Sequence, residues 1–173
     1  MFATIYLPNF YLQAALRHEP ERVDAPVALI DGEAAKAVII ELNDAAAQAG
    51  VTVGMTPSQG LARYLPLLVR TRARAQEKLL DETLLQLAFS LAPYVEATAA
   101  GVATVQFTDT RRMSANVERV VASLAAAGIT ARAGIADTPD ASLLAAHLAS
   151  PVLQVNDTRD FLAPLPIETL AQV

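Results

Sequence analysis

Few residues of this sequence have the type and spacing that chemistry requires. The chain has no cysteine, which excludes disulfides, thiolate metal sites and cysteine nucleophiles. Its two histidines, His18 and His147, lie far apart in the sequence, so a zinc site would depend on carboxylates to complete it. The glycines are too scattered for a phosphate-binding loop, and no serine stands in a G-x-S-x-G motif. Residue chemistry alone therefore points to no catalytic class.

Charge is distributed unevenly along the chain. The net charge is −5, whereas free-standing nucleic-acid-binding domains tend to be basic. Residues 1–62 carry three cations and seven acids, but residues 63–78 carry five cations and one acid. The arginines of this basic stretch are Arg63, Arg70, Arg72 and Arg74. Two interpretations stay open, namely the solvated start of a helix and a contact for DNA phosphates, which positions a protein without reading sequence.

Length and composition indicate a globular chain. The 173 residues are 53% hydrophobic and 18% charged, which excludes disorder and supplies a sizeable core. The longest apolar runs are far shorter than the roughly 20 residues of a membrane span, and the start has no basic signal region. We therefore expect a soluble, cytoplasmic protein without a membrane partner.

The hydrophobic pattern predicts alternating strands and helices. The first predicted strand, residues 2–7, has no close meander partner until the strands at 95–98 and 102–107. This order favours an α+β fold in which helices cover one face of an antiparallel or mixed sheet. The other predicted strands are 26–30, 37–42, 67–69, 129–136 and 152–155, and the main predicted helices are 9–17, 57–64, 73–91, 113–127 and 139–148.

Three stretches occur in a characteristic order and at characteristic separations. They are IYLPNFY at residues 5–11, GVTVGM at 50–55 with QGLA at 59–62, and APYVE at 92–96 continuing to AGIA at 133–136. Together they resemble the Y-family (translesion) DNA polymerases over nearly the whole chain. ADTP at 136–139 and LPIETL at 165–170 are similar to the ImuB-type branch, whose members carry this body without polymerase activity.

The resemblance implies a domain organisation. A palm-like sheet is expected from residues 1–8 and 70–165, with a small α/β fingers-like lobe at 9–69 inserted after the first strand. Residues 166–173 are expected to start a thumb, so the chain resembles the N-terminal part of a longer protein.

Departures from the polymerase pattern are informative. Active relatives need palm carboxylates because two magnesium ions must bridge the triphosphate and the primer hydroxyl. By the resemblance, these positions are occupied by Tyr6, Pro8, Gly101 and Val102, none of which offers the carboxylate that a hard divalent cation requires. Other acids near them in the sequence are Glu96, Asp109 and Asp137, but no predicted element makes them converge.

The residues that grip the nucleotide are also altered. The resemblance places the fingers tyrosine and arginine at Asp44 and Ala47, and a palm lysine at Pro139. By the resemblance, Phe10 and Tyr11 match the aromatic pair of the family, and Tyr11 occupies the position that packs against the nucleotide sugar in active relatives. Without a bound nucleotide, these two rings are expected to pack in the core between the lobes.

These observations lead to one main hypothesis and two alternatives. The chain resembles a non-catalytic adaptor of the DNA damage response and induced mutagenesis, with no cofactor and no metal. The implied partners are the sliding clamp, a RecA-type recombinase, an ImuA-type accessory protein and a C-family error-prone polymerase, at the nucleoid. Weak DNA contact is expected through the four arginines above. The alternatives are an active nucleotidyltransferase with an altered metal site and a protein-interaction domain unrelated to DNA.

Overall fold

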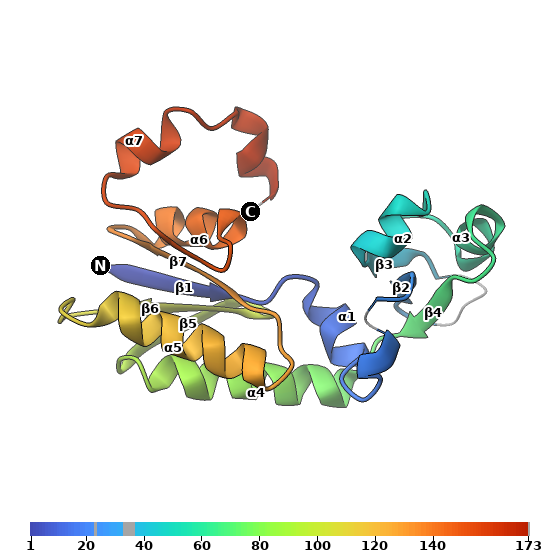
Figure 1. Ribbon diagram of the computed structural model, residues 1–173, viewed down its shortest axis with the longest axis horizontal. Coiled ribbons are helices and arrows are strands. Elements are labelled where there is room, and N and C mark those ends of the chain that lie inside the picture. The colour runs from blue at the N-terminus through green and yellow to red at the C-terminus, as the bar shows by residue number, and fades with distance from the viewer. Residues whose placement is uncertain (23, 33–36, 173) are drawn as a thin grey trace. The chain divides into compact units, whose positions relative to one another are not determined.

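The computed structural model of the protein describes residues 1–22, 24–32 and 37–172. Contacts divide the chain into unit 1, made of Met1–Pro8 and Asp81–Val173, and unit 2, made of Asn9–Leu80. Each unit has its own β-sheet (Figure 1). The division falls within helix α4 (Arg74–Phe89).

Unit 1 is built on a sheet that has five strands in the described part of the chain, in the order β5-β6-β1-β7-β8. The central strand β1 (Phe2–Tyr6) pairs antiparallel with β6 (Val102–Gln106) and β7 (Arg132–Ala136). The edges are β5 (Tyr94–Ala99) and β8 (Val152–Gln154), and β8 runs parallel to β7. The mixed sheet and its helices confirm the predicted α+β fold.

Helices cover both faces of this sheet, which corrects the expectation that they cover one face. Helix α6 (Pro139–Leu148) lies over one face, and α5 (Met113–Ala126) lies on the opposite side (Figure 1). Thr4 looks like an outward-facing residue of an alternating strand, but it is fully buried. Its hydroxyl shares hydrogen bonds with Ser142 of α6 at 2.7 Å and with Thr104 of β6 at 3.0 Å. A buried hydroxyl needs such partners, and here α6 supplies one.

Gly134 allows α6 to lie directly on β7. A Cβ built at this glycine would be 2.2 Å from the Ser142 carbonyl oxygen and 2.3 Å from the Ala146 nitrogen. Both are backbone atoms of the helix, so no side-chain movement could relieve the clash. The absence of a side chain at this position therefore sets the spacing between the helix and the sheet.

Unit 2 has a three-stranded sheet in the order β3-β2-β4 within the described residues. Its fully buried central strand β2 (Val27–Ile30) pairs antiparallel with β3 (Ile39–Leu42) and parallel with β4 (Leu68–Thr71). Helix α2 (Asp44–Gln48) begins after Asn43, whose side chain accepts a hydrogen bond from Ala46 N, as is typical of an N-cap. The helices of unit 2 are α1 (Phe10–Ala15), the 3-10 helix η1 (Pro20–Arg22), α2 (Asp44–Gln48) and α3 (Pro57–Arg63).

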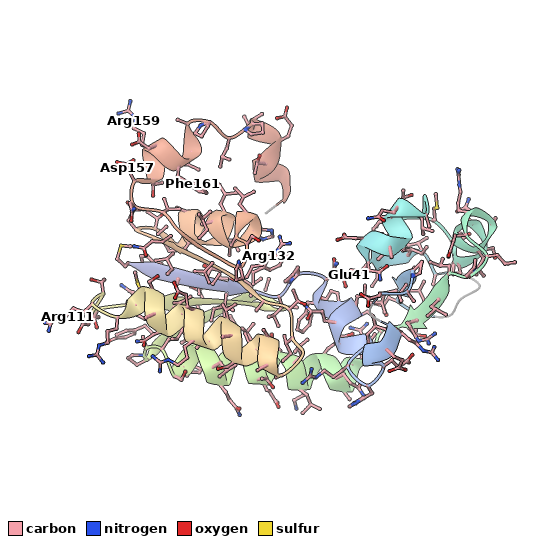
Figure 2. All side chains as sticks on the ribbon, viewed as in Figure 1. Glu41, Arg111, Arg132, Asp157, Arg159 and Phe161 are labelled. Carbon is pink, nitrogen blue, oxygen red and sulfur yellow. The ribbon has the colours of Figure 1, made fainter. Side chains whose placement is uncertain are left out.

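The boundary between the units differs from the predicted one. Residues 70–80, expected in the palm-like domain, lie in unit 2. Strand β4 pairs with β2, and ion pairs of Arg72 with Glu77 and of Arg74 with Asp31 join the start of α4 to the same unit. The end of the chain holds α7 (Thr158–Leu162) and the 3-10 helix η2 (Ile167–Gln172). Figure 2 shows Phe161 of α7 directed toward α6, and this ring packs on the small cluster that includes Ala141 and Ala145. That residues 166–173 start a thumb stays a prediction.

No helix in the described part of the chain has both the length and the apolar character needed to cross a bilayer.

Candidate functional site

Three of the positions at which the resemblance predicts carboxylates in active relatives meet at one end of the unit 1 sheet. Tyr6, the last residue of β1, pairs with Val102, the first residue of β6. Leu7 N donates a hydrogen bond to the Gly101 carbonyl oxygen at 2.9 Å, which joins the strand end to the β5–β6 turn. Pro8 follows directly in the chain. The structure thus brings Tyr6, Gly101 and Val102 together, although they are about a hundred residues apart in the sequence.

An aromatic stack and an arginine occupy this end of the sheet. The Tyr6 ring stacks on the His147 ring with a centroid distance of 4.1 Å and an interplanar angle of 21°. Arg132, the partner of Tyr6 on β7, donates from Nη1 to the His147 carbonyl oxygen at 3.1 Å. Burial lowers the pKa of the His147 imidazole, and the nearby Arg132 charge lowers it further. Figure 2 labels Arg132. The Tyr6 and His147 rings therefore pack against each other at this end of the sheet, and the Arg132 side chain binds the His147 backbone.

The alternative acids lie elsewhere. Asp109 and Asp137 follow the ends of β6 and β7 that pair with Phe2, so they are at the opposite end of the sheet from Tyr6. Glu96 is exposed on the edge strand β5 and pairs with Thr104 in the middle of the sheet. Among the described residues, no three His, Asp or Glu side chains lie close enough to share a metal ion.

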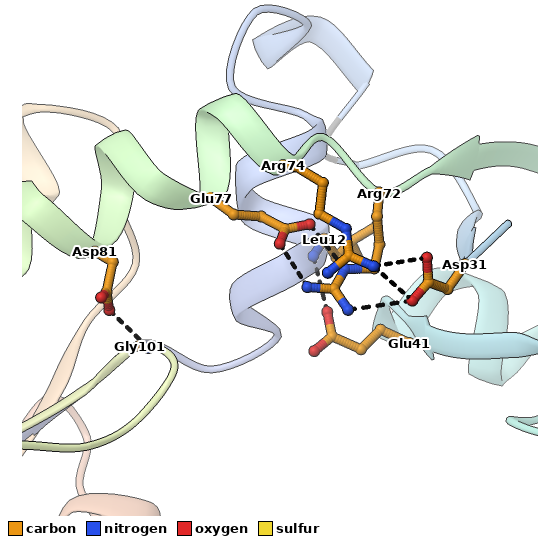
Figure 3. A network of polar contacts seen from close by, with 8 residues as sticks. All are labelled: Leu12, Asp31, Glu41, Arg72, Arg74, Glu77, Asp81 and Gly101. Atoms are coloured by element: carbon orange, nitrogen blue, oxygen red, sulfur yellow. Dashed lines mark hydrogen bonds and ion pairs between the residues drawn. The ribbon is translucent and has the colours of Figure 1, made fainter.

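Asp81 is the acid that sequence reasoning missed. Its Oδ1 accepts a hydrogen bond from Gly101 N at 3.3 Å, as Figure 3 shows. A carboxylate therefore does lie beside the Tyr6 end of the sheet, from helix α4. Asp81 carries no motif signal, because only the tertiary fold brings α4 to the β5–β6 turn.

Pro139 does not join the Tyr6 group. It starts α6, just after the end of β7 that pairs with Phe2. The residues that meet Tyr6 are instead His147, in the last turn of α6, and Arg132, at the start of β7. Neither was singled out for this site from the sequence, because a lone histidine and a lone arginine in a predicted helix and strand carry no signal of their own.

The predicted nucleotide-pocket residues lie in unit 2. Phe10 is buried and meets Tyr11 edge to face, with ring centroids 5.3 Å apart. The guanidinium carbon of Arg72 lies 3.8 Å from the centre of the Tyr11 ring, in cation–π geometry. Asp44 is exposed in the first turn of α2, and Ala47 of the same helix lines a cavity of about 390 Å³.

Among the described residues that line this cavity, Glu41 is the one that is ionisable. Its Oε2 accepts a hydrogen bond from Leu12 N at 2.8 Å (Figure 3). Burial raises the pKa of the Glu41 carboxyl, while the hydrogen bond from Leu12 and the charge of Arg72 act in the opposite direction. The cap residue of α1, Asn9, makes no side-chain capping bond, so Glu41 serves the start of this helix instead.

Most of the predicted DNA-contacting arginines pair with carboxylates. Arg70 forms two hydrogen bonds with Glu19, at 2.8 and 3.2 Å. Arg72 binds Glu77 at 2.5 and 2.9 Å and Asp31 at 3.3 Å, and Arg74 also binds Asp31 (Figure 3). Arg63 is exposed at the end of α3. That these arginines contact DNA stays a prediction. Arg70, Arg72 and Arg74 form ion pairs within unit 2.

Charge also differs between the units. Unit 1 contains five arginines and ten acidic residues, so its formal charge is −5. Unit 2 contains eight cationic and eight acidic residues, so its formal charge is zero. The unit that holds the Tyr6 site is therefore acidic, which disfavours a polyanion.

The fold is the one found in solved structures of Y-family DNA polymerases. The insertion ternary complex of Dbh DNA polymerase matches with a TM-score of 0.85 and 15% identity, over 97% of this chain and 53% of that chain. DinB from Sulfolobus solfataricus matches with a TM-score of 0.83 and 16% identity, over 97% of this chain and 52% of that one. A Y-family DNA polymerase chimera of Dbh and Dpo4 matches with a TM-score of 0.84 and 15% identity, over 97% and 53%. At these identities the likeness shows the fold alone.

A family model matches residues 5–147, and its description is the impB/mucB/samB family. Because this match covers most of the sequence, the chain belongs to the impB/mucB/samB family. It spans about half the length of the solved structures that it matches. No curated protein matches it.

Proposed function

We propose that this chain is part of a non-catalytic, polymerase-shaped adaptor that acts in DNA damage tolerance, of the ImuB type. In this role the polymerase fold is kept as a scaffold for other proteins and the chemistry is lost. The partners that the resemblance implies are the sliding clamp, a RecA-type recombinase, an ImuA-type protein and a C-family error-prone polymerase.

One observation carries the proposal. Tyr6, Gly101 and Val102 are juxtaposed at the end of the sheet, and none of them has a carboxylate. Two-metal phosphoryl transfer needs several oxygen ligands that converge on one point. Asp109 and Asp137 are kept from this point by the strand register, since both follow the opposite ends of their strands.

The pocket of unit 2 supports the same proposal. The described residues that line it include Glu41 and Ala47 but no lysine or arginine. A triphosphate carries several negative charges and is normally held by cations and oriented N–H groups. Here it would meet the Glu41 carboxylate.

An altered active site is the second candidate, and Asp81 is the observation in its favour. This carboxylate lies beside Gly101, so it could serve as one metal ligand. One carboxylate is fewer than a two-metal site uses, and Asp81 already accepts a hydrogen bond from the β5–β6 turn.

Calorimetric titration of the chain with a nucleoside triphosphate, in the presence and absence of Mg²⁺, separates the two candidates. The adaptor proposal predicts no saturable heat that depends on Mg²⁺. Saturable Mg²⁺-dependent binding that is lost in Asp81→Asn, with retention in the exposed control Glu96→Gln, would support the altered active site instead.

The adaptor role is tested with the full-length protein in cells. Loss of the gene is expected to lower damage-induced mutation frequency, and a Gly101→Ala, Val102→Ala variant that still accumulates is expected to restore it. Failure of this variant to restore mutagenesis, at normal abundance, would indicate that these positions act directly.

A further inference from the structure

The cavity of unit 2 has features that the proposed function leaves unused. Its volume of about 390 Å³ lies within the roughly 300–1,000 Å³ range of small-ligand pockets. Of the eight lining residues in the described part of the chain, five are aliphatic, namely Ile40, Leu42, Ala47, Val51 and Val53. The others are Asn9, Glu41 and Thr52, so the lining combines an apolar wall with one carboxylate.

The carboxylate is fixed in place. Glu41 lies on β3 and its Oε2 is held by Leu12 N at 2.8 Å. The side chain is only partly exposed, and its surroundings penalise the charged form. Figure 3 shows that one carboxylate oxygen faces Leu12 and that the other is directed away from it. Glu41 therefore lines the cavity with a carboxylate whose orientation is fixed by the start of α1, where Tyr11 also contributes a backbone hydrogen bond.

The cation whose charge acts on this carboxylate is engaged by other acids. Arg72 acts on Glu41 through its charge, but its guanidinium is bound to Glu77 and Asp31. Asp44 adds a further negative charge in the first turn of α2, the helix that contributes Ala47 to the lining. The local field at the cavity thus favours positive ligands.

We propose that this cavity binds a lysine side chain presented by a partner protein, with its methylenes against the aliphatic wall and its ammonium group at Glu41. Lysine suits such a site because its four-carbon stem packs on apolar surface while its charge remains paired. The inference rests on the proposed function in one respect, since a pocket that need hold no nucleotide is free to bind a partner.

The partner chemistry follows from charge and shape together. A purely apolar side chain would fill the aliphatic wall but would leave the Glu41 charge further desolvated, at a cost. A phosphate group would be repelled by the same carboxylate. A compact ammonium on an aliphatic stem satisfies both parts of the lining.

The proposal is tested by ¹H–¹⁵N NMR titration of the chain with Nα-acetyl-lysine N-methylamide, Nα-acetyl-norleucine N-methylamide and tripolyphosphate. The lysine probe is expected to shift the amides of Ile40–Leu42 and Val51–Val53 saturably. The norleucine probe has nearly the same stem without the charge and is expected to bind about fivefold more weakly, as for loss of one partly exposed ion pair. Tripolyphosphate is expected to leave these amides unmoved.

The matched variants are Glu41→Gln and Glu96→Gln. Glutamine at position 41 keeps an oxygen for Leu12 N, so α1 stays capped and the spectrum should retain its dispersion. Glu41→Gln is expected to bring the two amino-acid probes to equal affinity, whereas Glu96→Gln, on the exposed edge of unit 1, is expected to keep the fivefold preference. Equal binding of both probes by the unmodified chain, a preference that persists in Glu41→Gln, or tripolyphosphate binding at these amides would overturn the proposal.

Failure here and failure of the proposed function are distinguishable. Loss of lysine selectivity in a chain that still lacks Mg²⁺-dependent nucleotide binding refutes only this inference. Mg²⁺-dependent nucleotide binding refutes the proposed function whatever the lysine probe does.

Discussion

Arg72 joins three groups of unit 2. Its side chain is only 15% exposed, it makes two hydrogen bonds with the buried Glu77, and it lies on the Tyr11 ring. Burying two charges is favourable only when both are well paired, so removal of one partner leaves the other uncompensated. The sequence showed a basic stretch, but it did not show that acids 41 and 51 residues away would pair with Arg72 and Arg70.

Arg72→Ala is expected to lower the free energy of unfolding by about 3 kcal/mol or more, because Glu77 would be left as an unpaired buried charge. Arg72→Lys should recover only part of this loss, since lysine lacks the two-pronged geometry. The matched control is Arg74→Ala, whose side chain is 64% exposed and should cost at most about 1 kcal/mol. Urea unfolding measures all three, and equal losses for Arg72→Ala and Arg74→Ala would contradict this assignment.

His147 is expected to titrate below the usual histidine range. Its lowered folded-state pKa means that the unfolded chain binds the proton more readily, so stability falls as pH drops below about 6.5 toward that pKa. NMR titration of the imidazole should show the low pKa directly. Arg132→Gln removes the neighbouring positive charge and should raise the pKa, whereas a His147 pKa at or above 6.5 in the unmodified chain would contradict the packing described.

Helix α6 and strand β7 are where sequence reasoning succeeded in part. The apolar pattern predicted a helix at 139–148 and a strand at 129–136, and both exist as α6 and β7. The prediction missed that α6 covers a second face of the sheet, because the hydrogen bonds of Thr4 with Thr104 and Ser142 join residues 100 and 138 positions apart in the sequence. Local pattern fixes the type of an element, whereas the face that it covers depends on contacts between distant residues.

Gly134→Ala tests the close contact of α6 with β7. Because the added methyl would meet backbone atoms at 2.2 and 2.3 Å, the helix must shift, and a loss of about 3 kcal/mol is expected, at the upper end for overpacking. Gly54→Ala is the control: it has a φ of +88° but nothing within 4 Å of the added carbon, so only the cost of that backbone conformation, about 1–2 kcal/mol, is expected. A Gly134→Ala chain as stable as the Gly54→Ala chain would contradict the contact.

The molecule as a whole combines a polymerase fold with an acidic unit 1 and with arginines that are largely paired. The family could be predicted from the sequence, because the three stretches at 5–11, 50–62 and 92–136 occur in the order and at the separations seen in Y-family polymerases. It could not identify Asp81, Arg132 and His147 as the neighbours of the Tyr6 site, since each comes from a different element. That Tyr6, Gly101 and Val102 meet depends on the β1–β6 register, which no local pattern encodes.

Binding of this chain to primer–template DNA is expected to be weak, independent of sequence and lost at physiological salt, because unit 1 is acidic and Arg70, Arg72 and Arg74 already pair with carboxylates. Arg63→Ala should reduce the slope of log affinity against log salt by about one, as Arg63 is exposed on α3. Arg119→Ala, on α5 of the acidic unit 1, should leave the slope unchanged. Fluorescence anisotropy at several salt concentrations measures this, and tight binding at physiological salt would show that the DNA-facing surface has been misplaced.

Template-dependent primer extension is the most direct test of the claim that the chemistry is lost. The assay uses the full-length protein with Mg²⁺ and all four deoxynucleoside triphosphates. An Asp81→Asn variant shows whether the Asp81 carboxylate, beside the Tyr6 end of the sheet, contributes. We predict no extension above that of a protein-free reaction, for either protein. Extension by the unmodified protein that EDTA abolishes, and that Asp81→Asn reduces, would contradict the account.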